Sequence, residues 1–212
     1  MGRILLLLVA AGLLGGCAGL LPGQKQDPAR TYLLAPAAPG APGAIPAHGK
    51  LTILVSHPEA AAGYGTFRMA YLERDYRIDY FGYSEWVDTP AALIRPLLVG
   101  ALRASGGFQA VTDDGRSVDA DLRLDLVLLE IHQDFQERPS RGTVALRAQL
   151  IDLEGRRVVD TRTFRGTEPA PTEDAYGGVV AVNRVLTRLL PDVARFAVSA
   201  ASKLKGGQGG RG

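Results

Sequence analysis

Few side chains in this 212-residue sequence are arranged for catalysis. Ser56 and His57 are the closest approach to a nucleophile–base pair, but neighbouring residues of a strand point to opposite faces, so their side chains diverge. His132 follows a strongly alternating segment, where it is either a ligand contact or a solvated strand end. Asp121 and Asp125 share a face of that segment with an arginine between them, which is typical of a charge-matched face. No nucleophile elbow, phosphate-binding loop or metal-protease motif is present, so we expect no catalytic site and no enzyme.

Composition argues against several other classes of protein. The chain has one cysteine and three scattered histidines, so we expect neither an internal disulfide nor a metal site. The formal net charge is +2, which provides no basic field for nucleic acid. Hydrophobic residues make up 46% of the chain, a fraction that is sufficient for one globular domain with a substantial core.

The single cysteine stands where a modification is expected. Arg3 is followed by a charge-free apolar run and then by Leu14-Gly15-Gly16-Cys17, which resembles the lipobox of bacterial lipoprotein precursors. The resemblance implies that the Cys17 thiol becomes a diacylglyceryl thioether, that residues 1–16 are removed, and that the new amine is acylated. Several acyl chains at ~0.8 kcal/mol per buried methylene make a durable anchor. Ala18 after the cysteine implies, by the same resemblance, the outer membrane.

Two alternatives to the lipoprotein reading are an uncleaved membrane helix and an ordinary secretory leader. The apolar run is nearly long enough to span a membrane, but Gly15 and Gly16 weaken its helical propensity. A secretory leader would place the only cysteine at the cleavage site by coincidence. The lipoprotein interpretation is therefore favoured.

Composition also divides the rest of the chain. Residues 17–30 begin a segment rich in Ala, Pro and Gly that cannot bury enough apolar area to offset its ordering entropy. The short β-prone run Arg30–Leu34 interrupts the Ala/Pro/Gly-rich sequence and predicts an edge strand. We expect a lipidated tether over residues 17–30, a folded domain over residues 31–204 and a flexible tail over residues 205–212.

Hydrophobic periodicity predicts the elements of the domain. Strands are expected at 51–55, 108–111, 120–135, 143–153 and 157–164, with two short strands between 69 and 83. Thr89 and Pro90 predict the start of a helix that ends at Gly106, and Thr172–Asp174 predicts the cap of a long second helix that contains Pro191. The predicted fold class is α+β: a mainly antiparallel sheet with two helices packed on one face.

One segment is unusually aromatic. Six of the 14 Tyr, Phe and Trp residues lie between Tyr71 and Trp86. Such a cluster is either part of the core or an interface, because aromatic side chains supply large contact area at low entropic cost. Our candidates for contact with a partner or cargo are Tyr80, Phe81, Tyr83 and Trp86.

The order of these features resembles one protein family. The chain is similar to the ABC-type transport auxiliary lipoproteins in four features that follow one another in the sequence. These are a lipobox with a Pro-rich tether, the run Tyr32-Leu33-Leu34, the stretch from Tyr80 to Ile94 that leads through Trp86 and Pro90 into a helix, and Ser105-Gly106-Gly107-Phe108. These are packing motifs and not catalytic ones. The segment Gly63–Arg68 departs from the family pattern.

The resemblance implies a non-enzymatic lipoprotein tethered to the outer membrane on its periplasmic side. Its expected partners are a periplasmic MCE-domain protein and an ABC permease and ATPase, and its expected cargo is phospholipid or another apolar molecule. No cofactor is implied beyond the covalent lipid on Cys17. Unpaired sheet edges are compatible with a homo-oligomer. The alternative is a lipid or small-molecule carrier without a fixed transporter partner, in which the aromatic segment and the Pro191 helix enclose an apolar pocket.

Overall fold

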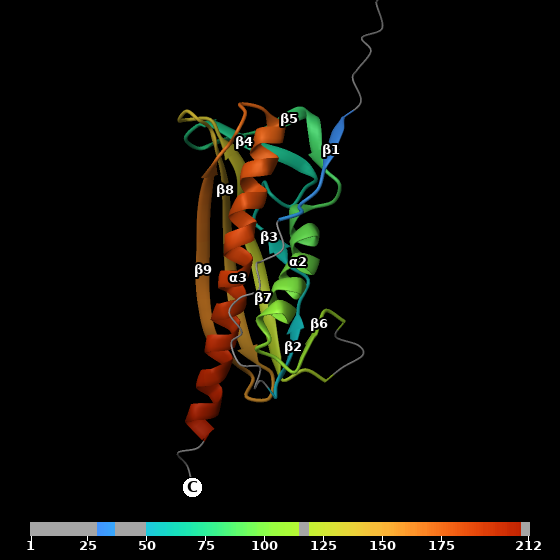
Figure 1. The fold of residues 1–212 in the computed structure, drawn as a ribbon, viewed down its shortest axis with the longest axis vertical. Coiled ribbons are helices and arrows are strands. Elements are labelled where there is room, and N and C mark those ends of the chain that lie inside the picture. Colours follow the sequence, from blue (N-terminus) through green and yellow to red (C-terminus); the bar gives the residue numbers. More distant parts are fainter. Residues whose placement is uncertain (1–28, 37–49, 115–118, 209–212) are drawn as a thin grey trace, which may run out of the picture.

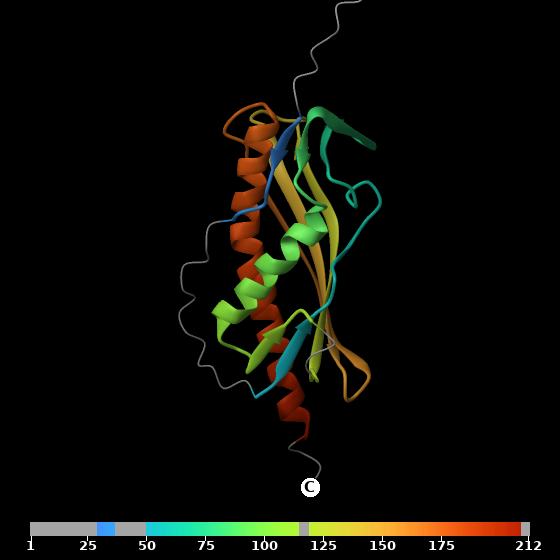
Figure 2. The same ribbon diagram turned by 90° about the vertical axis from the view of Figure 1, so that its right-hand side faces the viewer.

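The computed structural model describes residues 29–36, 50–114 and 119–208, which form a mixed sheet with two helices on one of its faces (Figures 1 and 2). The predicted α+β class is therefore confirmed. The helices are α2 (Pro90–Ser105) and α3 (Ala175–Gln208), and the strands are β1 (Arg30–Tyr32), β2 (Thr52–Val55), β3 (Glu59–Ala60), β4 (Arg68–Arg74), β5 (Arg77–Trp86), β6 (Ala110–Thr112), β7 (Leu122–Asp134), β8 (Arg141–Asp152) and β9 (Arg157–Pro169).

Strand β7 is the centre of the sheet. On one side it pairs antiparallel with β8 along its whole length, and β8 pairs in the same way with β9. On its other side β2, β3 and β4 follow one another, each parallel to β7. Strands β5 and β1 extend the sheet beyond β4, and β6 extends it beyond β2. The longest pairings are antiparallel as predicted, while five of the eight pairings in the described part of the chain are parallel.

Local signals place both helices where the sequence predicts them. Pro90 is the first residue of α2, where its missing N–H costs no hydrogen bond, and Gly106 ends the helix with a φ of 63°. Helix α3 begins after Asp174, whose carboxylate accepts a hydrogen bond of 2.9 Å from the Gly177 amide. Pro191 lies inside α3 and does not end it.

Helix α3 packs closely on the sheet. At Gly142 in β8, a Cβ atom would lie 2.6 Å from the Cβ of Ala181 and 2.7 Å from the amide nitrogen of Val182, so only glycine permits this approach. Apolar side chains at helical spacing along α3 are all buried: Val182, Val185, Leu186, Leu189, Leu190, Val193 and Phe196.

A β-bulge in β7 changes which side chains face the helices. The register with β8 shifts between Leu128 and Glu130, so Leu129 is the extra residue. Up to Leu128, even-numbered side chains face the core, as the alternation predicts. Beyond the bulge the odd-numbered side chains point inward, and His132 is turned to the outer face of the sheet.

Candidate partner-contact surface

The β4–β5 hairpin and the end of β7 bring three aromatic rings together. The ring centroid of Tyr71 lies 4.8 Å from that of Phe81 and 5.9 Å from that of Phe135. Such tilted and edge-to-face arrangements are the favourable geometries for aromatic pairs. We call Tyr71, Phe81 and Phe135 the aromatic cluster. Phe135 ends the alternating segment in the sequence, but its proximity to the hairpin arises from the parallel pairing of β4 with β7.

The aromatic cluster lines an open pocket of about 510 Å³. Glu73 and Arg138 contribute charged groups to its wall, and Gly82 leaves part of the wall without a side chain. A Cβ atom at Gly82 would meet no atom within 4 Å. The pocket therefore combines apolar ring faces with one cation and one anion, a surface suited to an amphipathic ligand or a protein side chain.

The four predicted contact residues occupy different environments. Trp86 is 4% exposed and belongs to the core, whereas Tyr83 is 59% exposed. Phe81 is half-buried within the aromatic cluster. Tyr80 points to the opposite face from Phe81, where its hydroxyl donates to the carbonyl of Gly63 at 3.0 Å. Only Phe81 and Tyr83 thus offer substantial apolar surface to a partner on the inner side or edge of the sheet.

Exposed apolar residues concentrate at one end of the domain. Figure 1 places β1, the β4–β5 hairpin and the start of α3 at the same end. We call this region the apolar end, because six of the seven large hydrophobic side chains that are exposed in the described ranges belong to these elements or to chain next to them: Leu33, Phe67, Tyr76, Tyr83, Val87 and Tyr176. Tyr76 is fully exposed and has a φ of 63°, which is unusual for a non-glycine residue. Clustering of this kind is typical of a surface that meets another molecule.

His132 occupies a buried site on the outer face of the sheet. Its Nδ1 lies 3.3 Å from the hydroxyl of Tyr64, and the side chain is 6% exposed. Burial lowers the pKa of His132, against the opposing effect of Glu130 and Asp134, and burial raises the pKa of Tyr64. Glu130 forms a two-point ion pair with Arg165, with a separation of 2.6 Å between Oε1 and one guanidinium nitrogen. The contact between the His132 imidazole and the Tyr64 hydroxyl is a structural one, and none of these groups is positioned as a nucleophile.

The other candidates for chemistry are engaged in structural contacts. The Ser56 hydroxyl donates to the carbonyl of Leu124 at 3.2 Å, and His57 is exposed. Asp121 accepts the amide of Thr52 at 2.6 Å, and Asp125 pairs with Arg123 at 2.9 Å. Within residues 29–36, 50–114 and 119–208, no group of three or more His, Cys, Asp and Glu residues could hold a metal ion.

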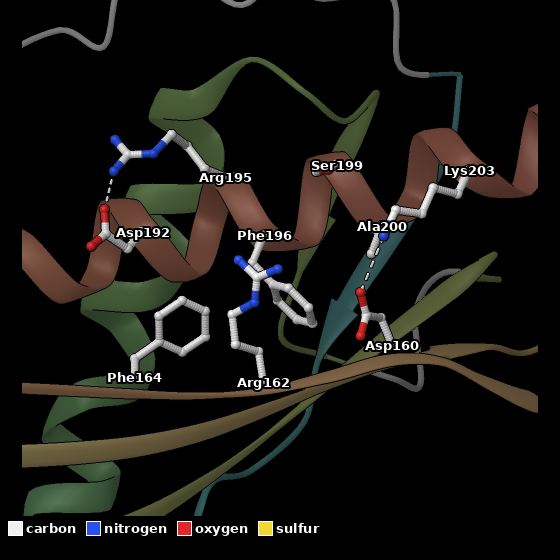
Figure 3. A pocket seen from close by; sticks show the side chains of 9 residues that line it. All are labelled: Asp160, Arg162, Phe164, Asp192, Arg195, Phe196, Ser199, Ala200 and Lys203. Atoms are coloured by element: carbon white, nitrogen blue, oxygen red, sulfur yellow. Dashed lines mark hydrogen bonds and ion pairs between the residues drawn. The ribbon is translucent and has the colours of Figure 1, made fainter.

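A charged groove of about 490 Å³ separates α3 from the edge strand β9 (Figure 3). Asp192 pairs with Arg195, and Asp160 lies 3.4 Å from the Nζ of Lys203. The guanidinium of Arg162 lies 5.3 Å from the ring centroid of Phe196. Both carboxylates of the groove are therefore already paired with cations. The charged side chains surround the rings of Phe164 and Phe196, which also line the groove.

The single apolar pocket that the carrier interpretation predicts is divided in two. Tyr80 and Phe81 line the pocket beside the hairpin, whereas Pro191 lines a separate groove between α2 and α3. The pocket and the groove are formed by different helices and strands. Cys17 and the leader fall outside the described residues, and no helix among those that are described is long and apolar enough to cross a membrane.

Comparison with known proteins identifies the family. The model of the ABC-type transport auxiliary lipoprotein component family matches residues 32–194, so the chain belongs to that family. The resemblance seen in the sequence is thereby confirmed. The family is one of cell-envelope lipoproteins associated with transport systems. No curated protein matches.

Solved structures share the fold. Protein XCC0632 from Xanthomonas campestris is 19% identical, with a TM-score of 0.75 over 84% of this chain and 99% of that chain. An uncharacterized protein is 12% identical, with a TM-score of 0.62 over 80% of this chain and 99% of its own. PelC from Paraburkholderia phytofirmans, described as a dodecamer, is 15% identical over 73% of this chain and 91% of that chain, with a TM-score of 0.47. That similarity is too low to transfer its assembly.

Proposed function

We propose that this protein is anchored to the periplasmic side of the outer membrane through Cys17 and serves an ABC transport system that includes an MCE-domain protein. Its cargo is phospholipid or another apolar molecule. The protein acts by docking and has no catalytic role. The observation that carries the proposal is the apolar end, which groups exposed Tyr83, Tyr76 and Val87 beside the aromatic cluster.

The position of strand β1 supports an orientation in which the apolar end faces the membrane. Strand β1 begins at Arg30 and pairs with β5 at that end, from Arg30 opposite Ser84 to Tyr32 opposite Trp86. Twelve residues lie between Cys17 and Arg30, so the chain takes thirteen steps of ~3.3 Å and reaches at most ~43 Å from the membrane surface. An anchor on Cys17 would therefore hold the apolar end nearer to the membrane than the opposite end of the domain. Cargo and partner subunits would then meet the protein at the apolar end.

Docking is tested by photo-crosslinking in cells. A photoreactive residue at Tyr83 is expected to capture an MCE-domain or ABC-transporter subunit, because this side chain is exposed at the apolar end. The matched control is Asp125 on the outer face of β7, where capture of that subunit is expected to be absent. Capture at Asp125 alone, or capture only of further copies of this chain from Tyr83, would contradict docking through the apolar end.

Anchoring is tested separately with Cys17→Ser. Without the thiol no thioether forms, so the protein is expected to leave the membrane fraction, and transport is expected to fall with it. Unchanged fractionation and transport would show that the anchor on Cys17 is not required.

A further inference from the structure

The pocket beside the β4–β5 hairpin contains an anion and a cation that are not paired with each other. Glu73 and Arg138 both line it, and both side chains are exposed. Within the described ranges, no hydrogen bond or ion pair engages the charged group of either residue. In the groove between α3 and β9, by contrast, both carboxylates are paired with cations. The two charges of the hairpin pocket are therefore available to a ligand.

The rings of the aromatic cluster are available in the same sense. In the described part of the chain a cation lies over two other rings: the Arg68 guanidinium is 3.9 Å from the ring centroid of Tyr80, and Arg162 lies over Phe196. The three rings of the aromatic cluster have no such partner there. Aromatic rings attract ammonium groups, because the face of the ring carries negative charge density. The pocket thus combines an unpaired carboxylate with unpaired rings, and both favour a ligand cation.

The space in this pocket is not bordered by undescribed chain. Its lining comes from the β4–β5 hairpin and from the end of β7 with the segment that follows it, and none of these residues adjoins an undescribed segment. Gly82 adds no side chain, and a Cβ atom there would meet nothing within 4 Å. The volume of about 510 Å³ lies within the range of roughly 300–1,000 Å³ that is typical of ligand sites. A molecule the size of a lipid headgroup therefore fits.

We infer that this pocket binds the headgroup of a phospholipid that carries both a phosphate and a primary ammonium, as phosphatidylethanolamine does. The ammonium pairs with Glu73 and contacts the aromatic cluster. The phosphate pairs with Arg138, whose guanidinium donates two parallel hydrogen bonds to phosphate oxygens. The inference deepens the proposed function, on which it rests, by naming the headgroup of the cargo and the site that recognises it.

The two unpaired charges distinguish this headgroup from other occupants. Phosphatidylglycerol offers only the phosphate, so Glu73 gains no partner and repels the ligand. A single lysine or glutamate side chain of a protein partner pairs with only one of the two charged groups. The rings favour a ligand that continues into apolar matter, because the glycerol and the first acyl carbons can lie against Tyr71 and Phe81.

The inference is tested by native mass spectrometry of the full-length lipidated protein in detergent micelles. The micelles contain dioleoyl phosphatidylethanolamine or dioleoyl phosphatidylglycerol, so the two probes differ only in the headgroup. We expect the affinity for phosphatidylethanolamine to be about tenfold higher, because only this lipid supplies a cation for Glu73.

Two substitutions remove one charge each from the pocket, and a third serves as a matched control. Glu73→Gln is expected to lower the affinity for phosphatidylethanolamine about tenfold and to leave that for phosphatidylglycerol no lower. Arg138→Gln is expected to weaken both lipids, since both carry the phosphate. Asp192→Asn removes a carboxylate from the groove beside α3 and is expected to change neither affinity. Circular dichroism melting checks that all three variants are folded.

Each other outcome contradicts the inference in a distinct way. Equal affinities for the two lipids, or a preference that survives in Glu73→Gln, would exclude recognition of the ammonium by this pocket. A preference that is lost equally in Asp192→Asn would reflect net charge and not a site. Water-soluble glycerophosphoethanolamine that binds as tightly as the lipid would make a free solute the ligand.

A photoreactive residue at Gly82 separates the lipid from a polypeptide. We expect it to capture phosphatidylethanolamine in vesicles that also contain phosphatidylglycerol. Capture of a transporter subunit and of no lipid would assign the pocket to a protein partner, and a crosslink to residues 18–28 would assign it to the tether of this chain. Capture of a transporter subunit from Tyr83 does not depend on these results, so failure of the headgroup site and failure of the docking proposal are distinguishable.

Discussion

Single residues in this domain acquire their properties from neighbours that are distant in the chain. His132 follows a strand of strict alternation, yet the bulge at Leu129 turns it to the outer face, where Tyr64 covers it. Glu130 in β7 and Arg165 in β9 meet because both lie opposite Ala145 in β8, the strand between them. The result is a buried imidazole with a lowered pKa beside an ion pair, on the face of the sheet opposite the helices.

His132 should make stability depend on pH. Burial lowers its folded-state pKa below the ordinary value near 6.5. The unfolded state therefore binds more protons as the pH falls through about 6.5, and the folded state loses stability until its own pKa is reached. We expect the melting temperature to fall less between pH 7 and pH 5 in His132→Gln than in the wild type, measured by circular dichroism.

The control for this pH effect is His57→Gln at an exposed position, which should retain the wild-type pH response. Equal pH responses in His132→Gln and the wild type would contradict the assignment of the effect to His132.

At the scale of elements, the two helices begin in different ways. Helix α3 has a side-chain cap, because Asp174 accepts the Gly177 amide and also a hydrogen bond of 2.6 Å from the Thr172 hydroxyl. Helix α2 follows Thr89, whose side chain makes no capping hydrogen bond, and Pro90 provides the preformed φ. The start of α3 therefore depends on a side chain, and the start of α2 on backbone geometry.

This difference predicts unequal effects of two alanine substitutions. Asp174→Ala should lower the free energy of unfolding by about 1 kcal/mol, because the Gly177 amide loses its partner. Thr89→Ala removes no capping bond and should cost less than about half as much. Urea unfolding of both variants measures the two free energies, and an equal or larger cost for Thr89→Ala would show that the assignment of caps is incorrect.

At the scale of the molecule, one core joins both ends of the sheet. The buried cluster extends from Trp86 near β1 to Phe164 in β9 and includes the inner faces of both helices. The long strands β7, β8 and β9 provide the platform, and the β4–β5 hairpin carries the apolar end on it. A docking surface built on this core is expected to keep its shape in the absence of a partner.

The single core predicts coincident unfolding by two probes. Trp86 is the only tryptophan and is 4% exposed, so its fluorescence reports on packing near β1 and β5. Circular dichroism reports on all of the helices and strands. We expect both signals to give the same urea midpoint. A fluorescence midpoint at lower urea would mean that the apolar end unfolds independently of the remaining core.

The sequence by itself determined the features that depend on neighbours in the chain. Thr89 and Pro90, Gly106 and Thr172–Asp174 marked the helix ends because capping and proline geometry act within one turn. Alternation from Leu122 to Leu128 established the inner face of the central strand, and the packing motifs identified the family.

Only the tertiary structure decided which surfaces are available for function. The bulge at Leu129, the placement of β2, β3 and β4 along one edge of β7, and the meeting of Phe135 with Tyr71 depend on pairings between segments far apart in the chain. Periodicity could not distinguish buried Trp86 from exposed Tyr83, since both lie in one strand and their burial depends on what packs against each. The groove between α2 and α3 exists because two helices that are distant in the chain pack side by side.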